Sequence, residues 1–298
     1  MIGCSIVVPT YNRVDYLKRC VNSLLNLDFS NFEIIIVNDN STDSTRDYLK
    51  NLNRNKVQIV NHSNNLGPSE SRNSGIKQAS FDYIVFIDDD CLAGQDWLKN
   101  FEISFNNSSA DFIIGQTYYV KENYKGYFPE RLTRNINAKW PMGCNIAFKK
   151  GVFKKIGSFN KEYDKYHNED SEIAIRSLAN NYKFSRSVKA IVYHQAMNWT
   201  TESLLKSARN ASVWPVLKKK YPENYLIFNP PIKYNIFINI EDYLYILLIP
   251  LLIPVLLIRY ILHGKNDFKI FFTKWPIYLF LRRYYIYKEA VKNKILML

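Results

Sequence analysis

The sequence predicts an α/β protein built on a mostly parallel sheet with helices on both faces. Apolar strand-like runs, polar loops and segments with helical spacing alternate through residues 1–105, and this alternation is typical of a parallel sheet covered by helices. Each polar loop directly follows an apolar run. Because ligands bind beyond the carboxyl ends of the strands in such sheets, these loops are expected to meet in one crevice.

The first part of the chain contains four predicted strands and three helices. The apolar runs lie at residues 4–8, 33–37, 57–60 and 83–87. A first helix begins near Arg13, because the residues after it have helical apolar spacing, namely Val14, Leu17, Val21, Leu24 and Leu25. A second helix ends near residue 52, and a third spans 69–79.

The pattern continues less regularly after residue 105. Strands are expected at 111–120, 142–148 and 191–193, and helices at 152–156, from Glu169 onward, and from about 202 toward 218–220. Thr200 or Thr201 is the expected N-cap of the last helix. Residues 121–139 show no clear period, and a loop of that length in a compact domain is often a lid or a binding loop.

Three acids follow the strand at 83–87: Asp88, Asp89 and Asp90. Because clustered carboxylates repel one another and cannot be buried without partners, they are expected at the open end of the strand, facing water or a cation. Mg²⁺ or Mn²⁺ prefers carboxylate oxygens and commonly keeps positions open for substrate phosphates. This edge is therefore a candidate site for a metal-bound diphosphate, and the alternative is an acidic turn that caps the next helix.

Charge and short motifs exclude several function classes. The formal net charge is +13, and residues 205–298 hold 15 Lys and Arg against 5 Asp and Glu. These basic residues are interleaved with long aliphatic and aromatic stretches, which fits an anionic membrane surface better than nucleic acid. The absence of GxGxxG after the first strand and of GxxxxGK[ST] anywhere argues against a dinucleotide fold and a P-loop NTPase. Four scattered cysteines without CxxC spacing favour a reducing compartment.

Six motifs occur in a fixed order along the chain. They are SIVVPTYNR, VNDNSTD, NLGPSESRNSGIKQA, VFIDDD, GCNIAFKKGVFKKIGSFN and NEDSEIAIR. In this order and spacing they resemble the family 2 glycosyltransferases with the GT-A fold, over roughly residues 3–195. The resemblance implies a Rossmann-like GT-A sheet and an inverting, metal-dependent transfer of a hexosyl or N-acetylhexosaminyl group from a nucleotide sugar, with UDP the expected nucleotide.

The resemblance also implies where the donor binds. Asp39 would accept the ring N–H of a uracil, and the charge of Arg72 suits a diphosphate. The implied nucleotide-sugar residues are Pro9, Thr10, Tyr11, Asp39, Arg72, Asp88 and Asp89, and the implied ligands of Mg²⁺ or Mn²⁺ are Asp88, Asp90 and His194. The alternatives are helix capping beside Ser41 for Asp39, a surface salt bridge for Arg72 and a hydrogen-bonded structural role for His194.

On the acceptor side, the resemblance implies two further groups. Gly143, Cys144 and Asn145 would line the sugar and acceptor side, where a small residue lets substrate approach the backbone. Glu169 and Asp170 resemble the family's ED pair, in which one carboxylate takes the proton of the attacking hydroxyl. Asp170 is the expected base, Glu169 the second candidate or an acceptor contact, and Arg176 is expected to orient either acid.

The second loop departs from the family pattern. Asn38 and Asn40 stand where the family usually has an acid and a glycine, which leaves the base specificity open.

The expected function is therefore sugar transfer to a hydroxyl of a glycan or a lipid-linked glycan. One alternative is a sugar nucleotidyltransferase, which is expected to have a glycine-rich basic loop after its first strand; this sequence has no such loop there. The other is a membrane-anchored sugar-binding or scaffold protein with an inactive GT-A domain. The sugar, the acceptor, the linkage and the oligomeric state stay open.

Residues 1–204 are the expected catalytic domain and residues 205–298 a helical, membrane-associating tail. Residues 243–258 carry no charge, but this run is shorter than the roughly 20 residues that span a bilayer. Pro250 and Pro254 favour a re-entrant or interfacial hairpin. Residues 270–287 mix aromatic and basic side chains, as in a helix at the interface. The expected location is the cytoplasmic face of the cell membrane, peripheral or C-terminally inserted; the alternative is that both segments pack on the catalytic domain or form a dimer contact.

Overall fold

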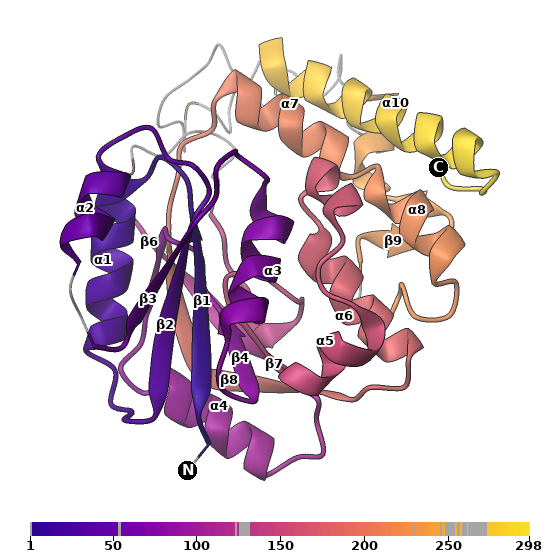
Figure 1. Ribbon diagram of the computed structural model, residues 1–298. Coiled ribbons are helices and arrows are strands. Elements are labelled where there is room, and N and C mark those ends of the chain that lie inside the picture. The colour runs from indigo at the N-terminus through magenta and orange to yellow at the C-terminus, as the bar shows by residue number, and fades with distance from the viewer. Residues whose placement is uncertain are drawn as a thin grey trace. The chain divides into compact units, whose positions relative to one another are not determined.

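The computed structural model divides the chain into two compact units (Figure 1). It describes residues 2–298 apart from 53–54, 123, 125–131, 229, 245, 248–253, 255–256, 258–260 and 262–272. The first unit comprises Met1–Val120, Thr133–Asp164 and Glu169–Gln195, and the second comprises Lys121–Leu132, Lys165–Asn168 and Ala196–Leu298.

An eight-stranded mixed sheet forms the centre of the first unit, in the order β3-β2-β1-β4-β7-β6-β8-β5. Its strands are β1 Cys4–Thr10, β2 Phe32–Asn38, β3 Val57–Asn61, β4 Tyr83–Phe86, β5 Cys91–Ala93, β6 Phe112–Val120, β7 Ile146–Lys149 and β8 Phe184–Gln195. The four strands from β3 to β4 are parallel, as expected. β6 and β8 are parallel to each other as well, whereas β7 runs antiparallel to both β4 and β6, and β5 runs antiparallel to β8. The sheet is therefore mixed but mostly parallel, and the correction concerns β5 and β7 alone.

The apolar pattern could not reveal these strand directions or all of the strands. An antiparallel neighbour needs no crossover helix, and a run of apolar residues carries no direction. The short strand β5 directly follows the three acids and was not expected. β8 is longer than the expected 191–193. The apolar pattern missed its first part, because exposed polar residues such as Arg186 and Lys189 interrupt the apolar run there.

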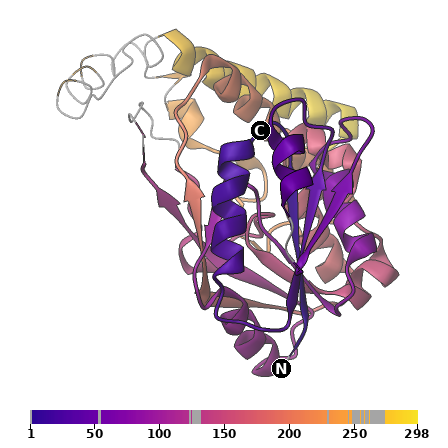
Figure 2. The ribbon, with the colours of Figure 1, turned by 60° about the vertical axis from the view of Figure 1, so that its left-hand side comes forward.

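Helices cover both faces of the parallel strands (Figure 2). The helices of the first unit are α1 Val14–Leu25, α2 Thr45–Asn51, α3 Pro68–Gln78, α4 Trp97–Asn106, α5 Lys150–Ile156 and α6 Glu169–Ala179, and the 3₁₀ turns are η1 Ile136–Ala138 and η2 Lys161–Tyr166. α1 and α4 bury Leu17 and Phe101 in the same core as Ile6 of β1. α3 packs on the other face of β1, where Gly75 lies against Val7.

This arrangement positions the loops of the candidate site. β1, β2 and β4 are parallel, so the loops that follow them leave the sheet at the same edge. The expected convergence of loops at the carboxyl ends of these strands is therefore built into the parallel half of the sheet.

The described part of the second unit contains the helices α7, α8 and α10 and a small hairpin. Its elements are α7 Thr201–Asn210, α8 Val213–Lys220, β9 Ile232–Lys233, β10 Phe237–Ile238 and α10 Trp275–Asn293. Thr200 caps α7 through a reciprocal pair of bonds with Ser203, which confirms the expected cap. α7 packs on α10 through an apolar cluster, and Asp242 binds Arg282 and Arg283 of α10.

The expected membrane-associating segments are only partly described. Most of residues 243–258 lies outside the described residues, and the described part of 270–287 belongs mainly to α10. Among the residues that the structure describes, no helix combines the length and the apolar character that crossing a membrane requires.

We predict that Gly75→Ala destabilises the first unit. A methyl group at residue 75 would lie 2.3 Å from Cγ1 of Val7, and such overpacking typically costs about 1–3 kcal/mol. The free energy of unfolding in urea, measured by circular dichroism, should fall by about this amount.

The matched control is Gly151→Ala in α5, where an added methyl group meets nothing within 4 Å. It should leave stability unchanged or raise it by up to about 1 kcal/mol. Equal stability of the two variants would contradict the packing of α3 on β1.

Candidate active site

The acid loop after β4 is tied to the end of β1. Asp89 accepts a hydrogen bond from Thr10 Oγ1 at 2.7 Å and one from Arg13 Nη1 at 3.2 Å. Asp89 is 4% exposed. Burial raises its pKa to about 7, although Arg13 opposes the shift. The acids were expected to face water or a cation, whereas Asp89 is instead enclosed between two protein donors.

Arg13 is a residue that the sequence analysis did not assign to the site. Its guanidinium also donates to Asp90 Oδ2 at 2.8 Å, so that it bridges two of the three acids. It directly precedes α1 and ends the motif SIVVPTYNR. The signal available in the sequence was a cation in the loop after β1, at the same sheet edge as the acids.

Asp90 and His194 lie together, as the resemblance implied. His194 Nε2 is 3.4 Å from Asp90 Oδ1, and Cys91 Sγ is 3.7 Å from the same oxygen. Cys91 and His194 face each other across β5 and β8. The other ring nitrogen of His194, Nδ1, is 2.9 Å from the carbonyl oxygen of Gln195. Since a carbonyl only accepts, Nδ1 carries the hydrogen and donates it to Gln195, which leaves Nε2 directed toward Asp90.

This donor set fits a divalent cation. A carboxylate oxygen, an imidazole nitrogen and a thiol sulfur lie within 4.8 Å of one another, and the Nδ1–carbonyl bond orients the imidazole as in protein metal sites. Asp88 is not part of this cluster. It is partly exposed and accepts a bond from Arg72 Nη2 at 2.9 Å, so the structure places it on the Arg72 side.

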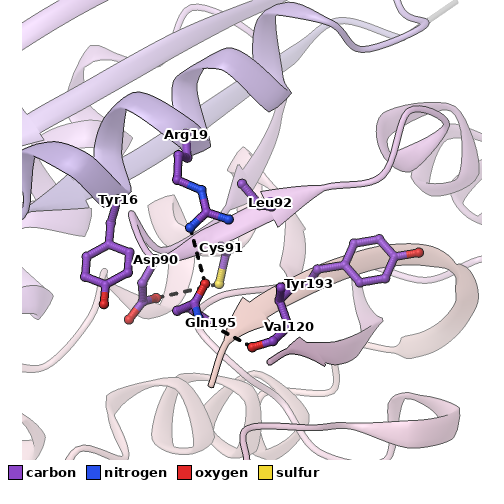
Figure 3. Close-up of a pocket in the computed structure, with 8 residues that line it drawn as sticks. All are labelled: Tyr16, Arg19, Asp90, Cys91, Leu92, Val120, Tyr193 and Gln195. Carbon is purple, nitrogen blue, oxygen red and sulfur yellow. Dashed lines mark hydrogen bonds between the residues drawn. The ribbon is translucent and has the colours of Figure 1, made fainter. Parts of the chain in front are cut away.

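A pocket adjoins Asp90 (Figure 3). Its lining residues are Tyr16, Arg19, Asp90, Cys91, Leu92, Val120, Tyr193 and Gln195. Arg19 and Gln195 are hydrogen bonded to each other across it. The pocket brings together α1, β5, β6 and β8 beside the Asp90–His194 pair.

Arg72 is buried and joins the acid loop to the Glu169–Asp170 pair. Its guanidinium donates to Asp88 and, at 2.5 Å, to Oε1 of Glu169. Its exposed fraction is 4%, so the alternative of a surface salt bridge does not hold. Gly143 is part of this arrangement, because a methyl group at residue 143 would lie 2.6 Å from Arg72 Nη2.

Asp170 lies at the start of α6 and is held by two backbone groups. Its Oδ2 accepts from the N–H of Gly143 at 2.8 Å, and its Oδ1 accepts from the N–H of Ser171 at 2.6 Å. Burial and the nearby charge of Glu169 raise the pKa of Asp170 to about 7, against the lowering effect of the Gly143 N–H. A carboxyl group with this pKa can exchange a proton near neutral pH.

Two expectations for the acceptor side need correction. Arg176 does not bind Glu169 or Asp170; it donates to Glu172 and to the carbonyls of Ile156 and Ser158. Its guanidinium is therefore bonded to other groups than the acids it was expected to orient.

Asn145 lies in the core of the sheet. Its amide nitrogen donates to the carbonyls of Gln116 and Ala190, and its amide oxygen accepts from Trp97 Nε1. Cys144 is buried as well. Within the segment 143–145, the group beside Arg72 and Asp170 is therefore the backbone of Gly143.

Asp39 is buried at the end of β2 and does not cap α2. It accepts hydrogen bonds from His62 and from the backbone of Leu66 and Gly67. Ser44 is the N-cap residue of α2. In the first loop, Thr10 is buried, Pro9 is partly buried and Tyr11 is 44% exposed.

Known proteins with similar sequences are glycosyltransferases. The chain is 38% identical over 118 residues to a poly(ribitol-phosphate) beta-glucosyltransferase of Bacillus spizizenii, covering 38% of this chain and 18% of that protein. It is 38% identical over 89 residues to a GalNAc(5)-diNAcBac-PP-undecaprenol beta-1,3-glucosyltransferase of Campylobacter jejuni, covering 29% of each chain. The chain spans less than half the length of these curated relatives.

Solved structures share the fold. TarS of Staphylococcus aureus in complex with UDP-GlcNAc has a TM-score of 0.56 at 24% identity, over 72% of this chain and 66% of that one. A mannosyltransferase of Pyrobaculum calidifontis in complex with GDP-Man and Mn²⁺ has a TM-score of 0.59 at 17% identity, over 98% and 87% of the two chains.

The family described as Glycosyl transferase family 2 matches residues 5–177. This range includes all of β1 but its first residue, the acid loop, Arg72 and the Glu169–Asp170 pair, and it is more than half of the chain. The protein therefore belongs to glycosyltransferase family 2.

Proposed function

We propose that this protein is a metal-dependent, inverting glycosyltransferase that moves a sugar from a UDP-sugar to a hydroxyl of a glycan or a lipid-linked glycan. The observation that carries the proposal is the buried Arg72, which bonds Asp88 on one side and Glu169 on the other. It connects acids suited to a donor diphosphate with an acid suited to deprotonate an acceptor.

Asp170 is the proposed general base. Inversion requires a carboxylate that takes the proton of the attacking hydroxyl while the bond to the diphosphate breaks. The Gly143 and Ser171 N–H groups hold Asp170 in place, and a pKa of about 7 lets it accept a proton and release it again near neutral pH. Glu169 is occupied by Arg72, which makes it the weaker candidate.

The donor diphosphate is proposed to bind along the acid loop. Arg13 and Arg72 supply two guanidinium groups there, and guanidinium groups recognise phosphate oxygens through paired hydrogen bonds. Asp90 and His194 would hold Mg²⁺ or Mn²⁺, and this cation would offset the charge on the leaving diphosphate. Thr10 and Asp89 keep the first loop and the acid loop together.

Similar proteins support the choice of substrates. One fold neighbour is described in complex with UDP-GlcNAc and another with GDP-Man and Mn²⁺. The names of similar sequences specify transfer to poly(ribitol-phosphate) and to an undecaprenol-linked glycan. These acceptors motivate a glycan or a lipid-linked glycan as the acceptor of this protein.

The second unit is proposed to hold the enzyme at the cytoplasmic face of a membrane, peripherally or by C-terminal insertion. α10 exposes apolar side chains three or four residues apart, at Ile277, Phe280, Tyr284, Tyr287 and Val291. Residues at this spacing share one face of a helix. Lys288, Lys292 and Lys294 are exposed nearby, and such a combination suits a helix at an anionic lipid surface.

We predict that transfer depends on Mg²⁺ or Mn²⁺ and is lost in Asp90→Ala. The variant removes the carboxylate that faces His194. Transfer should be measured with added metal and in excess EDTA, and metal binding should be followed separately by calorimetry.

Asp96→Ala is the matched control, because Asp96 is an exposed acid beside α4. It should keep metal binding and transfer. Full turnover of the unaltered protein in excess EDTA would overturn the metal requirement.

We predict that Asp170→Asn keeps donor binding and lowers transfer by roughly 10²-fold or more, the usual scale for the loss of a positioned base. In the unaltered protein only the ionised form of Asp170 can accept a proton. Because its pKa is about 7, kcat should fall by about tenfold per pH unit below that value and level off above it.

Donor binding by calorimetry and transfer at several pH values test this prediction together. Glu162→Gln, which alters an exposed acid on η2, should behave like the unaltered protein. Near-normal transfer by Asp170→Asn would reassign the base to Glu169.

We predict that Phe280→Glu with Val291→Glu weakens binding to vesicles of phosphatidylglycerol and phosphatidylcholine by at least about tenfold, since both changes place charge on the apolar face of α10. Cosedimentation measures the binding. Ile103→Glu, at an exposed apolar position of α4, should have no effect, and unchanged binding of the double variant would show that α10 does not contact the lipid.

A further inference from the structure

The carboxylate of Asp39 has one acceptor position left. Its Oδ1 lies 2.7 Å from His62 Nδ1 and accepts from the N–H of Leu66 at 2.8 Å, and its Oδ2 accepts from the N–H of Gly67 at 2.8 Å. An ionised carboxylate offers about four acceptor positions. In the described part of the chain no other donor bonds these oxygens, so the remaining position belongs to Oδ2.

His62 is held between Asp39 and α3. Its side chain is 8% exposed, and its Nε2 lies 2.9 Å from the hydroxyl of Ser74. A carboxylate accepts but does not donate, so Nδ1 carries the hydrogen and donates it to Asp39. On the other side of the ring, Nε2 is hydrogen bonded to the hydroxyl of Ser74. Rotation of the ring would break both bonds.

Backbone hydrogen bonds near His62 also help to hold Asp39 in place. The N–H of His62 donates to the carbonyl of Asn38 at 2.9 Å, which continues the pairing of β2 with β3. Gly67 has φ +93°, a conformation that favours glycine, and its N–H reaches Asp39 from the start of α3. Asp39 therefore meets donors from the residue that follows β3 and from the loop before α3.

The order Ser74, His62, Asp39 is also that of a hydrolytic triad, but the position of Ser74 argues against this use. A triad needs backbone or side-chain donors that stabilise an oxyanion beside the serine. Ser74 lies inside α3, where the neighbouring backbone N–H groups are already bonded within the helix. The network is better suited to holding Asp39 than to activating Ser74.

We propose that His62 is a positioning residue that fixes Asp39 so that its remaining acceptor position receives a ring N–H of the donor's nucleobase. Uracil N3 and guanine N1 carry such a hydrogen, whereas cytosine N3 and adenine N1 do not. His62 thus contributes to the choice of nucleotide without touching it. This inference rests on the proposed function only in that the first unit binds a nucleoside diphosphate.

The binding of UDP, GDP, CDP and ADP to the full-length protein, measured by calorimetry, tests the proposal. We expect UDP or GDP to bind at least about tenfold more tightly than CDP and ADP, the scale of a hydrogen bond to a charged group. In His62→Leu this preference should shrink to within about threefold. With saturating donor, kcat should stay near its original value while KM for the donor rises.

Two conservative variants separate positioning from folding. The amide nitrogen of asparagine is bonded to Cγ, the carbon that bears Nδ1 in histidine. His62→Asn should therefore keep the preference for UDP or GDP. The amide nitrogen of glutamine is bonded one carbon further from the backbone, where Nε2 lies in histidine. His62→Gln should therefore lose the nucleotide preference, as His62→Leu does. If His62→Leu does not fold, the comparison of His62→Asn with His62→Gln still tests the proposal.

Gln58→Leu is the matched control on β3. It removes another side-chain bond from this strand to a buried carboxylate, that of Glu33 at 2.6 Å, but at the opposite end of the strand. It should leave the ratio of the dissociation constants unchanged.

The outcomes distinguish this inference from the proposed function. An unaltered preference in both His62→Leu and His62→Gln, or a preference of the unaltered protein for CDP or ADP, defeats the inference and leaves glycosyl transfer standing. If the unaltered protein binds none of the four nucleotides, both fail.

Discussion

The first unit depends on one buried cation. Arg72 is 4% exposed and meets a carboxylate on each side, Asp88 and Glu169. A buried guanidinium without such partners is strongly destabilising, and removing one partner leaves an uncompensated charge. The absence of a side chain at Gly143 leaves room for it. Through these contacts α3, the acid loop and the start of α6 are placed relative to one another.

The acids around this cation outnumber the cations. Among the described residues, the guanidinium groups that bond Asp88, Asp89, Asp90 and Glu169 are those of Arg13 and Arg72, and Asp90 also lies beside His194. Burial, together with the nearby charge of Asp90, raises the pKa of Asp89 to about 7 although Arg13 opposes the shift. Clustered carboxylates of this kind are the usual setting of a bound divalent cation in proteins. The charges that oppose folding here are therefore the ones on which the proposed metal site rests.

Much of the parallel half of the fold could be predicted from sequence, because each apolar run there is followed by a polar loop and a helix. The directions of β5 and β7 could not, since an apolar run carries no direction and both strands run antiparallel to their neighbours. At the site, the pairing of Asp90 with His194 follows the family motifs. The contacts of Arg13, Arg176 and Asn145 depend on side-chain directions that a motif does not record. Asn145 illustrates this: its residue type suits a substrate contact, but its amide is used by Trp97 and two backbone carbonyls.

The register of β5 has a consequence for how the chain can change. β5 is three residues long, lies at one edge of the sheet and sets Cys91 opposite His194. A shift of one residue turns every side chain of a strand to the other face. An insertion or deletion between Ile87 and Gly94 would therefore carry Asp90 away from His194 even if both residues were retained. Length in this stretch should be under stronger selection than most of its individual side chains, and a designer who grafts the site should copy its spacing before its composition.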